Sequence, residues 1–156
     1  MSAINIRPAR ADDALPMAEL LEQLARQYIT FEFTATAQEK FLKSNDASAI
    51  STFMASGFQY WVAERGDALV GFAGVRNESH LYHLFVAKEE QSRGVGRSLW
   101  ETARQACRVA GNPSRFTVNS SNNAVGVYES FGFVRAGHTQ DSDGVLFNPM
   151  VFEDAG

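Results

Sequence analysis

The chain has 156 residues, 45% hydrophobic and 21% charged, which is the composition of an ordinary folded domain and not of a disordered chain. The net charge of −4 disfavours nucleic-acid binding, no apolar run is long enough to cross a membrane, and the one cysteine excludes an intramolecular disulfide. Residues 1–10 lack the apolar core of a signal peptide, so we expect a cytoplasmic protein that forms one domain over residues 1–156.

The N-terminal part predicts a strand followed by three helices. Residues 3–7 have the alternation of a strand that Pro8 stops, and Asp12 or Asp13 is expected to cap the next helix. Shorter helices are expected at 37–42 and 46–55. The first helix carries an apolar stripe at helical spacing, made of Leu15, Ala18, Leu21, Leu24, Ala25 and Tyr28.

Three strands are expected next. Residues 58–64 and 68–76 are rich in aromatic and β-branched side chains and flank the turn signal Arg65-Gly66-Asp67, which indicates a hairpin. The apolar run 81–86 follows as a third antiparallel neighbour and leads into a glycine-containing loop.

That loop, Gln91 to Leu99, opens a helix that runs to about Ala110. The first N–H groups of a helix lack partners and carry partial positive charge, so a strand, loop and helix start in this order predict an anion site. Gly94 and Gly96 allow a close backbone approach, and Arg93 and Arg97 add charge. Two phosphate motifs do not fit, because the loop has no Gly-Lys pair and has Leu99 at the third glycine position of the dinucleotide fingerprint. A tightly packed helix start with solubilising arginines remains open.

The C-terminal part predicts one more strand–helix unit and a closing hairpin. Gly111 and Pro113 are expected to end the long helix, whose apolar stripe holds Cys107 as a buried thiol. The strand 115–118 should then lie parallel to 81–86. A helix that carries Tyr128 is expected next, with Asn122 or Asn123 as its N-terminal cap and Gly132 at its end. Strands are expected at 133–136 and 145–152, separated by a polar turn at 140–144.

Two segments together resemble one known family. The pattern Gln91-x-x-Gly94-x-Gly96 resembles the acetyl-CoA pyrophosphate loop of the GCN5-related N-acetyltransferases, the GNAT family. The later segment Asn122-Asn123-Ala124, Tyr128-Glu129 and Phe131-Gly132-Phe133 is similar to that family's N-x-A…Y-E…G-F segment, in the same order. The resemblance covers nearly the whole chain. It implies an α/β fold with a mixed, mostly antiparallel sheet of about six to seven strands, helices on both faces, and a splay between the strands at 81–87 and 115–119.

The resemblance implies acetyl-CoA as the acetyl donor and no metal. Backbone N–H groups from Arg93 to Ser98 would hold the pyrophosphate, and the pantetheine arm would pair with the strand before the loop, with an N–H near Val86 facing the thioester carbonyl. Asn119 and Asn123 are candidates to bond the cofactor or the acceptor; a turn and a helix cap are their alternative roles. The expected cofactor-binding residues are Leu84, Phe85, Val86, Gln91, Ser92, Arg93, Gly94, Val95, Gly96, Arg97, Ser98, Asn119, Asn123 and Tyr128.

The catalytic residues implied are an acid and a base. Tyr128 is the candidate acid for the departing thiolate, because a phenol is protonated at neutral pH; its alternative role is core packing. His80 and His83 are candidate bases, and strand alternation sends them to opposite faces unless a bulge intervenes. Glu32 is a weaker candidate, and water is another. Phe31 and Phe33 are candidates for the wall of the acceptor pocket, or for ordinary core aromatics.

The function implied is transfer of an acetyl group to a primary amine of a small molecule or protein, by direct attack and without a covalent enzyme intermediate. The alternatives are a non-catalytic acyl-CoA-binding module of the same fold and, disfavoured by the loop, a nucleotide-phosphate enzyme. We expect no nucleic-acid or membrane partner, and the pattern leaves open both a homodimer and the identity of the acceptor.

Overall fold

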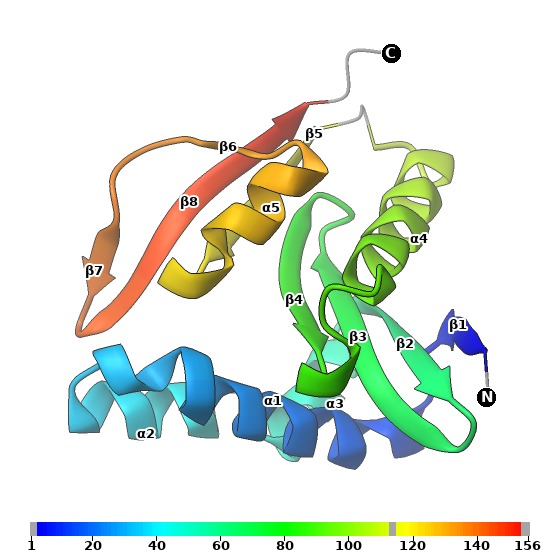
Figure 1. The fold of residues 1–156 in the computed structure, drawn as a ribbon, viewed down its shortest axis with the longest axis horizontal. Coiled ribbons are helices and arrows are strands. Elements are labelled where there is room, and N and C mark those ends of the chain that lie inside the picture. The colour runs from blue at the N-terminus through cyan, green and yellow to red at the C-terminus, as the bar shows by residue number, and fades with distance from the viewer. Residues whose placement is uncertain (1–2, 113–114, 154–156) are drawn as a thin grey trace.

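The computed structural model describes residues 3–112 and 115–153, which form a single mixed sheet flanked by helices (Figure 1). Its strands are β1 (Ile4–Pro8), β2 (Gln59–Arg65), β3 (Ala68–Arg76), β4 (His80–Val86), β5 (Arg115–Ser120), β6 (Val134–Arg135), β7 (Gln140–Ser142) and β8 (Val145–Glu153). The α helices are α1 (Ala14–Tyr28), α2 (Ala35–Lys43), α3 (Ala47–Ala55), α4 (Val95–Val109) and α5 (Val125–Phe131). The short 3-10 helices are η1 (Ala11–Asp13), η2 (Thr30–Glu32), η3 (Lys88–Glu90) and η4 (Asn122–Ala124).

The sheet has the order β1-β2-β3-β4-β5-β8-β6, with β7 paired to β8. All neighbouring strands are antiparallel except β4 and β5, which are parallel because α4 connects them as a crossover. This confirms the mixed, mostly antiparallel sheet, with eight strands in place of six to seven. The additional strand is β7, which falls within the expected polar turn 140–144. Its three residues are exposed and show no apolar alternation, so the sequence pattern does not predict their pairing with β8.

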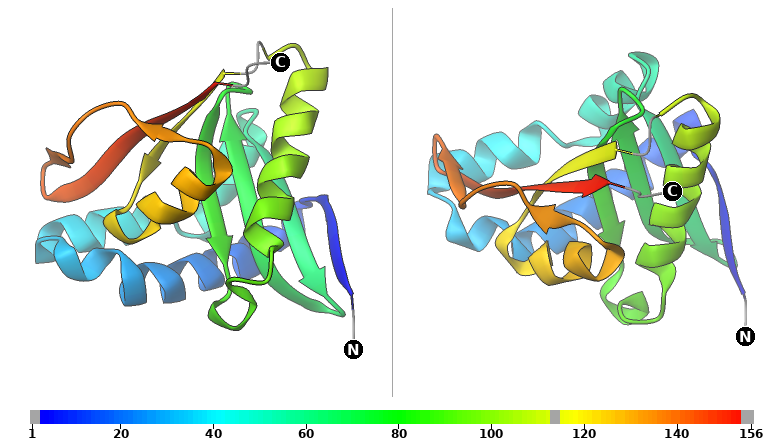
Figure 2. Two further views of the ribbon diagram at one scale, coloured as in Figure 1. Left: turned by 45° about the horizontal axis from the view of Figure 1, so that its top comes forward. Right: turned by 90° about the horizontal axis from the view of Figure 1, so that it is seen from above.

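Helices cover both faces of the sheet (Figure 2). On one face α1 and α3 pack over the strands through a core cluster that includes Met17, Leu21, Ile50, Val62 and Phe72. On the other face α4 and α5 pack through a second cluster that includes Leu99, Trp100, Phe116, Phe133 and Met150. Cys107 is buried in this second cluster, as expected.

Helix α4 lies over β2, β3 and β4 and reaches β5 and β8 through the side chain of Trp100. Leu99 packs against β3 near Gly71, whereas the ring of the next residue, Trp100, lies 5.1 Å from Phe116 on β5 and 5.4 Å from Phe152 on β8. Trp100 is fully buried although it directly follows the buried Leu99, and adjacent helical positions rarely share one face. The buried face of α4 is therefore wide enough to hold both halves of the sheet together.

The start of α1 differs from the expectation in two respects. Leu15 is 60% exposed, because the buried face begins at Ala14 and continues through Met17 and Ala18. Asp13 does not cap the helix through its side chain. Its carboxylate instead accepts hydrogen bonds from Arg7 at 2.8 and 3.0 Å, and these bonds hold the pKa of Asp13 below its usual value. Asp46 caps α3 by accepting from the N–H of Ala49 at 2.9 Å, and the stop predicted at Gly132 is confirmed, with a left-handed backbone. Pro113 lies outside the described residues.

Gly74 on β3 allows the packing against the Tyr60 ring to be tested. A Cβ at Gly74 would overlap the ring of Tyr60, whose Cζ would lie 2.6 Å away. We expect Gly74→Ala to lower the free energy of unfolding by ~1–3 kcal/mol, the usual effect of overpacking a core. Gly126→Ala on α5 is the matched control, since its Cβ would meet no atom within 4 Å and should stabilise the helix by up to ~1 kcal/mol. Urea denaturation measures both, and equal effects would contradict the packing at Tyr60.

Candidate active site

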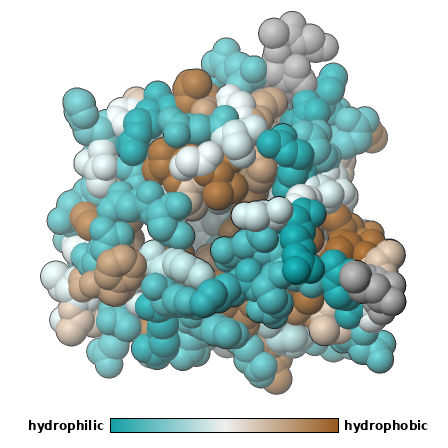
Figure 3. Space-filling view, in the orientation of Figure 1, coloured by the Kyte–Doolittle hydropathy of each residue, from teal (hydrophilic) through white to brown (hydrophobic). Residues whose placement is uncertain are grey.

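A cavity of about 920 Å³ lies where β4 and β5 part. Their paired register covers two residue pairs, His80 with Thr117 and Leu81 with Val118, after which β4 continues along the cavity to Val86. Figure 3 shows the hollow near the middle of the face that Figure 1 presents, between α5 and β4. The cavity thus occupies the splay expected between these strands.

The glycine loop forms one end of the cavity. Gly94 is the N-cap of α4 with a φ of +88°, a conformation that favours glycine, and the N–H of Ser98 makes the first helical bond to its carbonyl. A Cβ at Gly94 would meet no atom within 4 Å, and one at Gly96 would lie 3.5 Å from Val86 Cγ2. Gly94 therefore leaves open space beside the N–H groups that a helix start leaves without helical partners, and Gly96 keeps the first turn of α4 free of a side chain.

The loop side chains divide into two groups. Arg97 lines the cavity, donates to the carbonyl of Ser130 at 2.9 Å and lies over the Phe131 ring. Gln91 donates its side-chain amide to the carbonyl of Val86 at 3.0 Å. Three expected cofactor residues lie outside the lining: Arg93 and Ser98 are exposed beside it, and Val95 is buried in the core. The lining does include the expected residues Leu84, Phe85, Val86, Gln91, Ser92, Gly94, Gly96, Arg97, Asn119, Asn123 and Tyr128.

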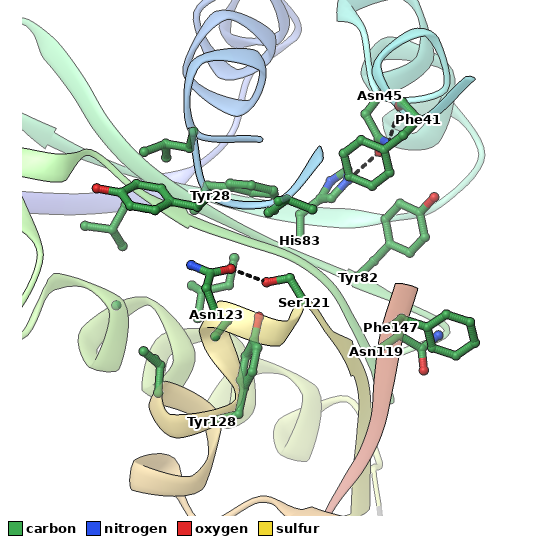
Figure 4. Close-up of a pocket in the computed structure, with 18 of the residues that line it drawn as sticks. Tyr28, Phe41, Asn45, Tyr82, His83, Asn119, Ser121, Asn123, Tyr128 and Phe147 are labelled. Atoms are coloured by element: carbon green, nitrogen blue, oxygen red, sulfur yellow. Dashed lines mark hydrogen bonds between the residues drawn. The ribbon is translucent and has the colours of Figure 1, made fainter. Parts of the chain in front are cut away.

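Tyr128 projects from α5 into the cavity. Its ring packs edge-on against Phe131 and Phe133, and Figure 4 shows its hydroxyl directed towards Ser121 and Asn123. Burial raises the pKa of Tyr128 above its ordinary value. The phenol is therefore protonated throughout the neutral range and can donate a proton or a hydrogen bond into the cavity.

A β-bulge brings both candidate histidines to the same side of the sheet. On β3, Gly74 pairs with His83 while the next residue, Val75, pairs with Leu81, so Tyr82 is the extra residue on β4. The bulge interrupts the alternation that would have separated His80 from His83. Both line the cavity together with Tyr82.

His83 is engaged at both ring nitrogens. Its Nε2 lies 2.7 Å from Asn45 Oδ1 and its Nδ1 lies 2.8 Å from the hydroxyl of Tyr60. Asn45 donates its amide N–H to the carbonyl of Phe41, which leaves its oxygen to accept from His83 Nε2–H, so His83 Nδ1 accepts from Tyr60. Burial lowers the pKa of His83 to about 3. These contacts favour a structural role for His83 over that of a base.

His80 is the histidine with a nitrogen left to serve the cavity. Its Nδ1 lies 2.7 Å from Thr117 Oγ1, at the point where β4 and β5 pair. Burial, and secondarily the positive charge of Arg76, lowers the pKa of His80 to about 4. The imidazole is therefore neutral at pH 7, and the same shift makes it a weaker proton acceptor than a solvated imidazole.

The asparagines after β5 do not cap α5. The N-cap position of this helix is Ala124, and no side chain bonds there. Asn123 lines the cavity and accepts from the hydroxyl of Ser121 at 2.7 Å. Asn122 donates to Glu32 at 3.0 Å. This bond joins η2 to η4 and engages the carboxylate of Glu32, the weaker candidate base.

The two phenylalanines of the η2 segment differ in position. Phe33 lines the cavity, whereas Phe31 is 68% exposed and is not part of its lining or of the core. The expectation of a pocket wall therefore fits Phe33 alone.

A family comparison agrees with this geometry. The model of the acetyltransferase (GNAT) domain matches residues 18–153. The chain belongs to the GNAT acetyltransferase family. Human N-acetyltransferase 8B is 30% identical over 95 residues, which are 53% of this chain and 41% of that protein. The chain spans about half the length of the curated relatives it matches.

Solved GNAT structures share the fold over almost the whole chain. A GCN5-related N-acetyltransferase from Rhodopseudomonas palustris has a TM-score of 0.80 at 23% identity, covering 98% of this chain and 97% of that one. PaiA N-acetyltransferase from Thermoplasma acidophilum, solved in complex with coenzyme A, has a TM-score of 0.77 at 16% identity, with 97% and 99% covered. Within residues 3–112 and 115–153 of this GNAT chain, no helix combines the length and apolar character that spanning a membrane requires.

The GNAT site contains residues that sequence reasoning missed. Asn45 and Tyr60 hold His83 from elements 38 and 23 positions away in the chain. Phe41 and Phe147 line the cavity from α2 and β8. No local motif marks these four residues, since only the packed fold brings them to the cavity.

The buried histidine makes stability depend on pH. The unfolded chain binds a proton at His83 near its ordinary pKa of 6.5, whereas the folded protein does so only near pH 3. The unfolded state thus binds more protons between these values, and stability must fall as the pH falls, by on the order of 1.4 kcal/mol per pH unit from this group. Urea denaturation between pH 7.5 and 4.5 measures the slope, and His80 adds to it with the same sign.

Two variants identify the source of this slope. His83→Gln should reduce the slope to the part that His80 contributes, even where it lowers stability at every pH. Gly126→Ala, which removes no titratable group, should leave the slope unchanged. An unaltered slope in His83→Gln would show that His83 is not the neutral buried group inferred here.

Proposed function

We propose that this GNAT protein transfers the acetyl group of acetyl-CoA to a primary amine by direct attack, without a covalent enzyme intermediate. One observation carries the proposal: a single cavity is bordered by a helix N-terminus, the open edge of a strand and a buried, protonated tyrosine. The PaiA N-acetyltransferase, which has the same fold, was solved in complex with coenzyme A.

The residues of the loop fit the pyrophosphate of the cofactor. The open space at Gly94 lies beside the first N–H groups of α4, Gly96 adds no side chain there, and Arg97 supplies positive charge at the same end of the cavity. The edge of β4 at residues 84–86 offers backbone groups to the amides of the pantetheine arm, as the missing β5 pairing leaves it facing the cavity. When bound, acetyl-CoA supplies an acetyl thioester that an amine nitrogen can attack.

Tyr128 and His80 have complementary proton roles in this proposal. Tyr128 donates to the departing sulfur, because its raised pKa keeps the proton on the phenol until charge develops there. His80 accepts the amine proton, directly or through a water, because its imidazole is neutral and lines the same cavity. His83 keeps β4 and the α2–α3 connection in place through Asn45 and Tyr60.

The loop assignment is tested at Gly96. Gly96→Val places a branched side chain where the pyrophosphate would lie, while the first added carbon meets only ordinary contacts. We expect coenzyme A affinity, measured by calorimetry, to fall by at least ~10-fold, with little change in melting temperature. Gly96 is a cleaner site than Gly94, whose positive φ makes any side chain strained. Unchanged affinity in folded Gly96→Val, with Gly126→Ala as the reference variant, would overturn the assignment.

The acid is tested by Tyr128→Phe, which retains the ring and its packing. With an amine that is turned over, kcat should fall by ~10²-fold or more, because the hydroxyl acts mainly as negative charge develops on sulfur. Coenzyme A affinity and melting temperature should stay near those of the wild type. Full kcat in this variant would assign Tyr128 to packing, and binding of acetyl-CoA without thiol release for any amine would favour the acyl-CoA-binding module.

A further inference from the structure

Aromatic rings line the end of the cavity opposite the glycine loop. This end is bounded by η2, α2 and the β7–β8 hairpin, which lie on the far side of β4 from α4 in Figure 1. Phe33, Phe41, Tyr82 and Phe147 line it from four separate segments, and each is only partly buried. Figure 4 shows Phe41, Tyr82 and Phe147 on one side of the cleft, away from Tyr28.

Contacts with other rings hold Phe33, Phe41 and Tyr82 in position. Phe33 and Phe41 meet edge to face with their centroids 5.7 Å apart. The Tyr82 ring meets Phe53 and Phe58 at 5.3 Å each, again edge to face. The apolar wall is therefore formed before a ligand arrives, so an apolar ligand would not have to order it.

Charged groups are sparse at this aromatic end. The charged side chains that line the cavity are Lys40, Arg97 and Asp143, and Arg97 belongs to the loop end, where it bonds Ser130. Of the described residues that line the aromatic end, Lys40 is the cation and Asp143 is the carboxylate. The Arg76 guanidinium also lies 5.7 Å from the centroid of the Tyr82 ring, and both histidines are neutral at pH 7. A second ammonium group brought against this wall would lose its hydration and, among the described residues that line the cavity, would find one carboxylate partner, Asp143.

We propose that the acetyl acceptor is a compact primary amine with an aromatic or branched apolar body, such as an arylalkylamine, and not a polyamine. The inference rests on the proposed function and specifies its substrate class. The apolar body would pack among the four rings, and the nitrogen would face Tyr128 and His80. The nitrogen–acetyl bond forms as the carbon–sulfur bond breaks; the amine proton goes to His80 or water, and the thiolate takes a proton from Tyr128.

The test compares phenethylamine with spermidine in two assays. Release of the coenzyme A thiol gives kcat/KM for each amine, and calorimetry on the coenzyme A-saturated protein gives each binding constant. We expect phenethylamine to exceed spermidine by at least ~10-fold in both, a difference that apolar pocket contacts can supply. Equal or better values for spermidine in the binding assay would overturn the inference.

The two assays separate this inference from the proposed function. If no amine causes thiol release, the proposed transfer fails, whereas tighter binding of phenethylamine still supports the recognition inferred here. If spermidine is acetylated faster and bound more tightly, the transfer stands and the substrate class is wrong.

Two phenylalanines two positions apart provide matched variants. Phe33→Ser removes a ring from the wall and should raise the KM for phenethylamine by ~10-fold with a smaller change in kcat. Phe31→Ser makes the same change at an exposed ring outside the cavity and should leave KM within ~2-fold. If Phe33→Ser has a much lower melting temperature than the wild type, Phe147→Ser removes a different ring of the wall, on β8, and tests the same prediction. Equal KM values in all three variants would overturn the aromatic wall.

Discussion

The structure depends on a parallel strand pair that is only two residue pairs long. β4 pairs with β3, and β5 pairs with β8. The sheet therefore consists of two half-sheets, β1 to β4 in one and β5, β8 and β6 in the other, and each of the two central strands is paired on the side away from the other. The crossover through α4 makes β4 and β5 parallel and places the start of α4 at the carboxyl end of β4, beside the gap. Leu99 and Trp100 then keep the half-sheets together behind the gap. A helix N-terminus, an open strand edge and a cavity consequently meet at one place.

The bulge at Tyr82 is the second constraint on the site. A regular β4 would direct His80 and His83 to opposite faces, and only one could reach the cavity. The extra residue puts both there, but their surroundings give them different chemistry. His83 sits in a chain of hydrogen bonds from Tyr60 to Asn45, whereas His80 bonds Thr117 through one nitrogen. Their proximity in sequence thus gives little information about which can take part in proton transfer.

Sequence reasoning succeeded where the signal is local. The glycine loop and its helix depend on the φ preference of Gly94 and on periodic apolar positions, and both can be read within a short window. The stop at Gly132 is equally local. The parallel partner of β4 follows from the handedness and length of one crossover.

What sequence reasoning missed depends on distant contacts or on the absence of periodicity. β7 is polar and exposed, so it exists only because β8 offers a partner. The asparagines at 122 and 123 look like helix caps, but Glu32 and Ser121 provide competing partners for their side chains. The Tyr82 bulge is set by pairing with β3 and has no sequence signature of its own. The aromatic end likewise draws Phe33 and Phe147 from opposite ends of the chain.

The short β4–β5 pairing has a consequence for the energetics of the whole domain. In the free protein, most of β4 makes no backbone hydrogen bonds to β5. A ligand whose amides bond the edge of β4 would supply some of these hydrogen bonds. Because such a ligand binds the folded chain and not the unfolded one, its binding free energy adds to the cohesion between the half-sheets. Hydrogen exchange at the amides of residues 82–86 that face the gap would then slow on binding, while amides in the β2–β3 hairpin would change less. The ligand would act as a structural element of the fold as well as a reactant.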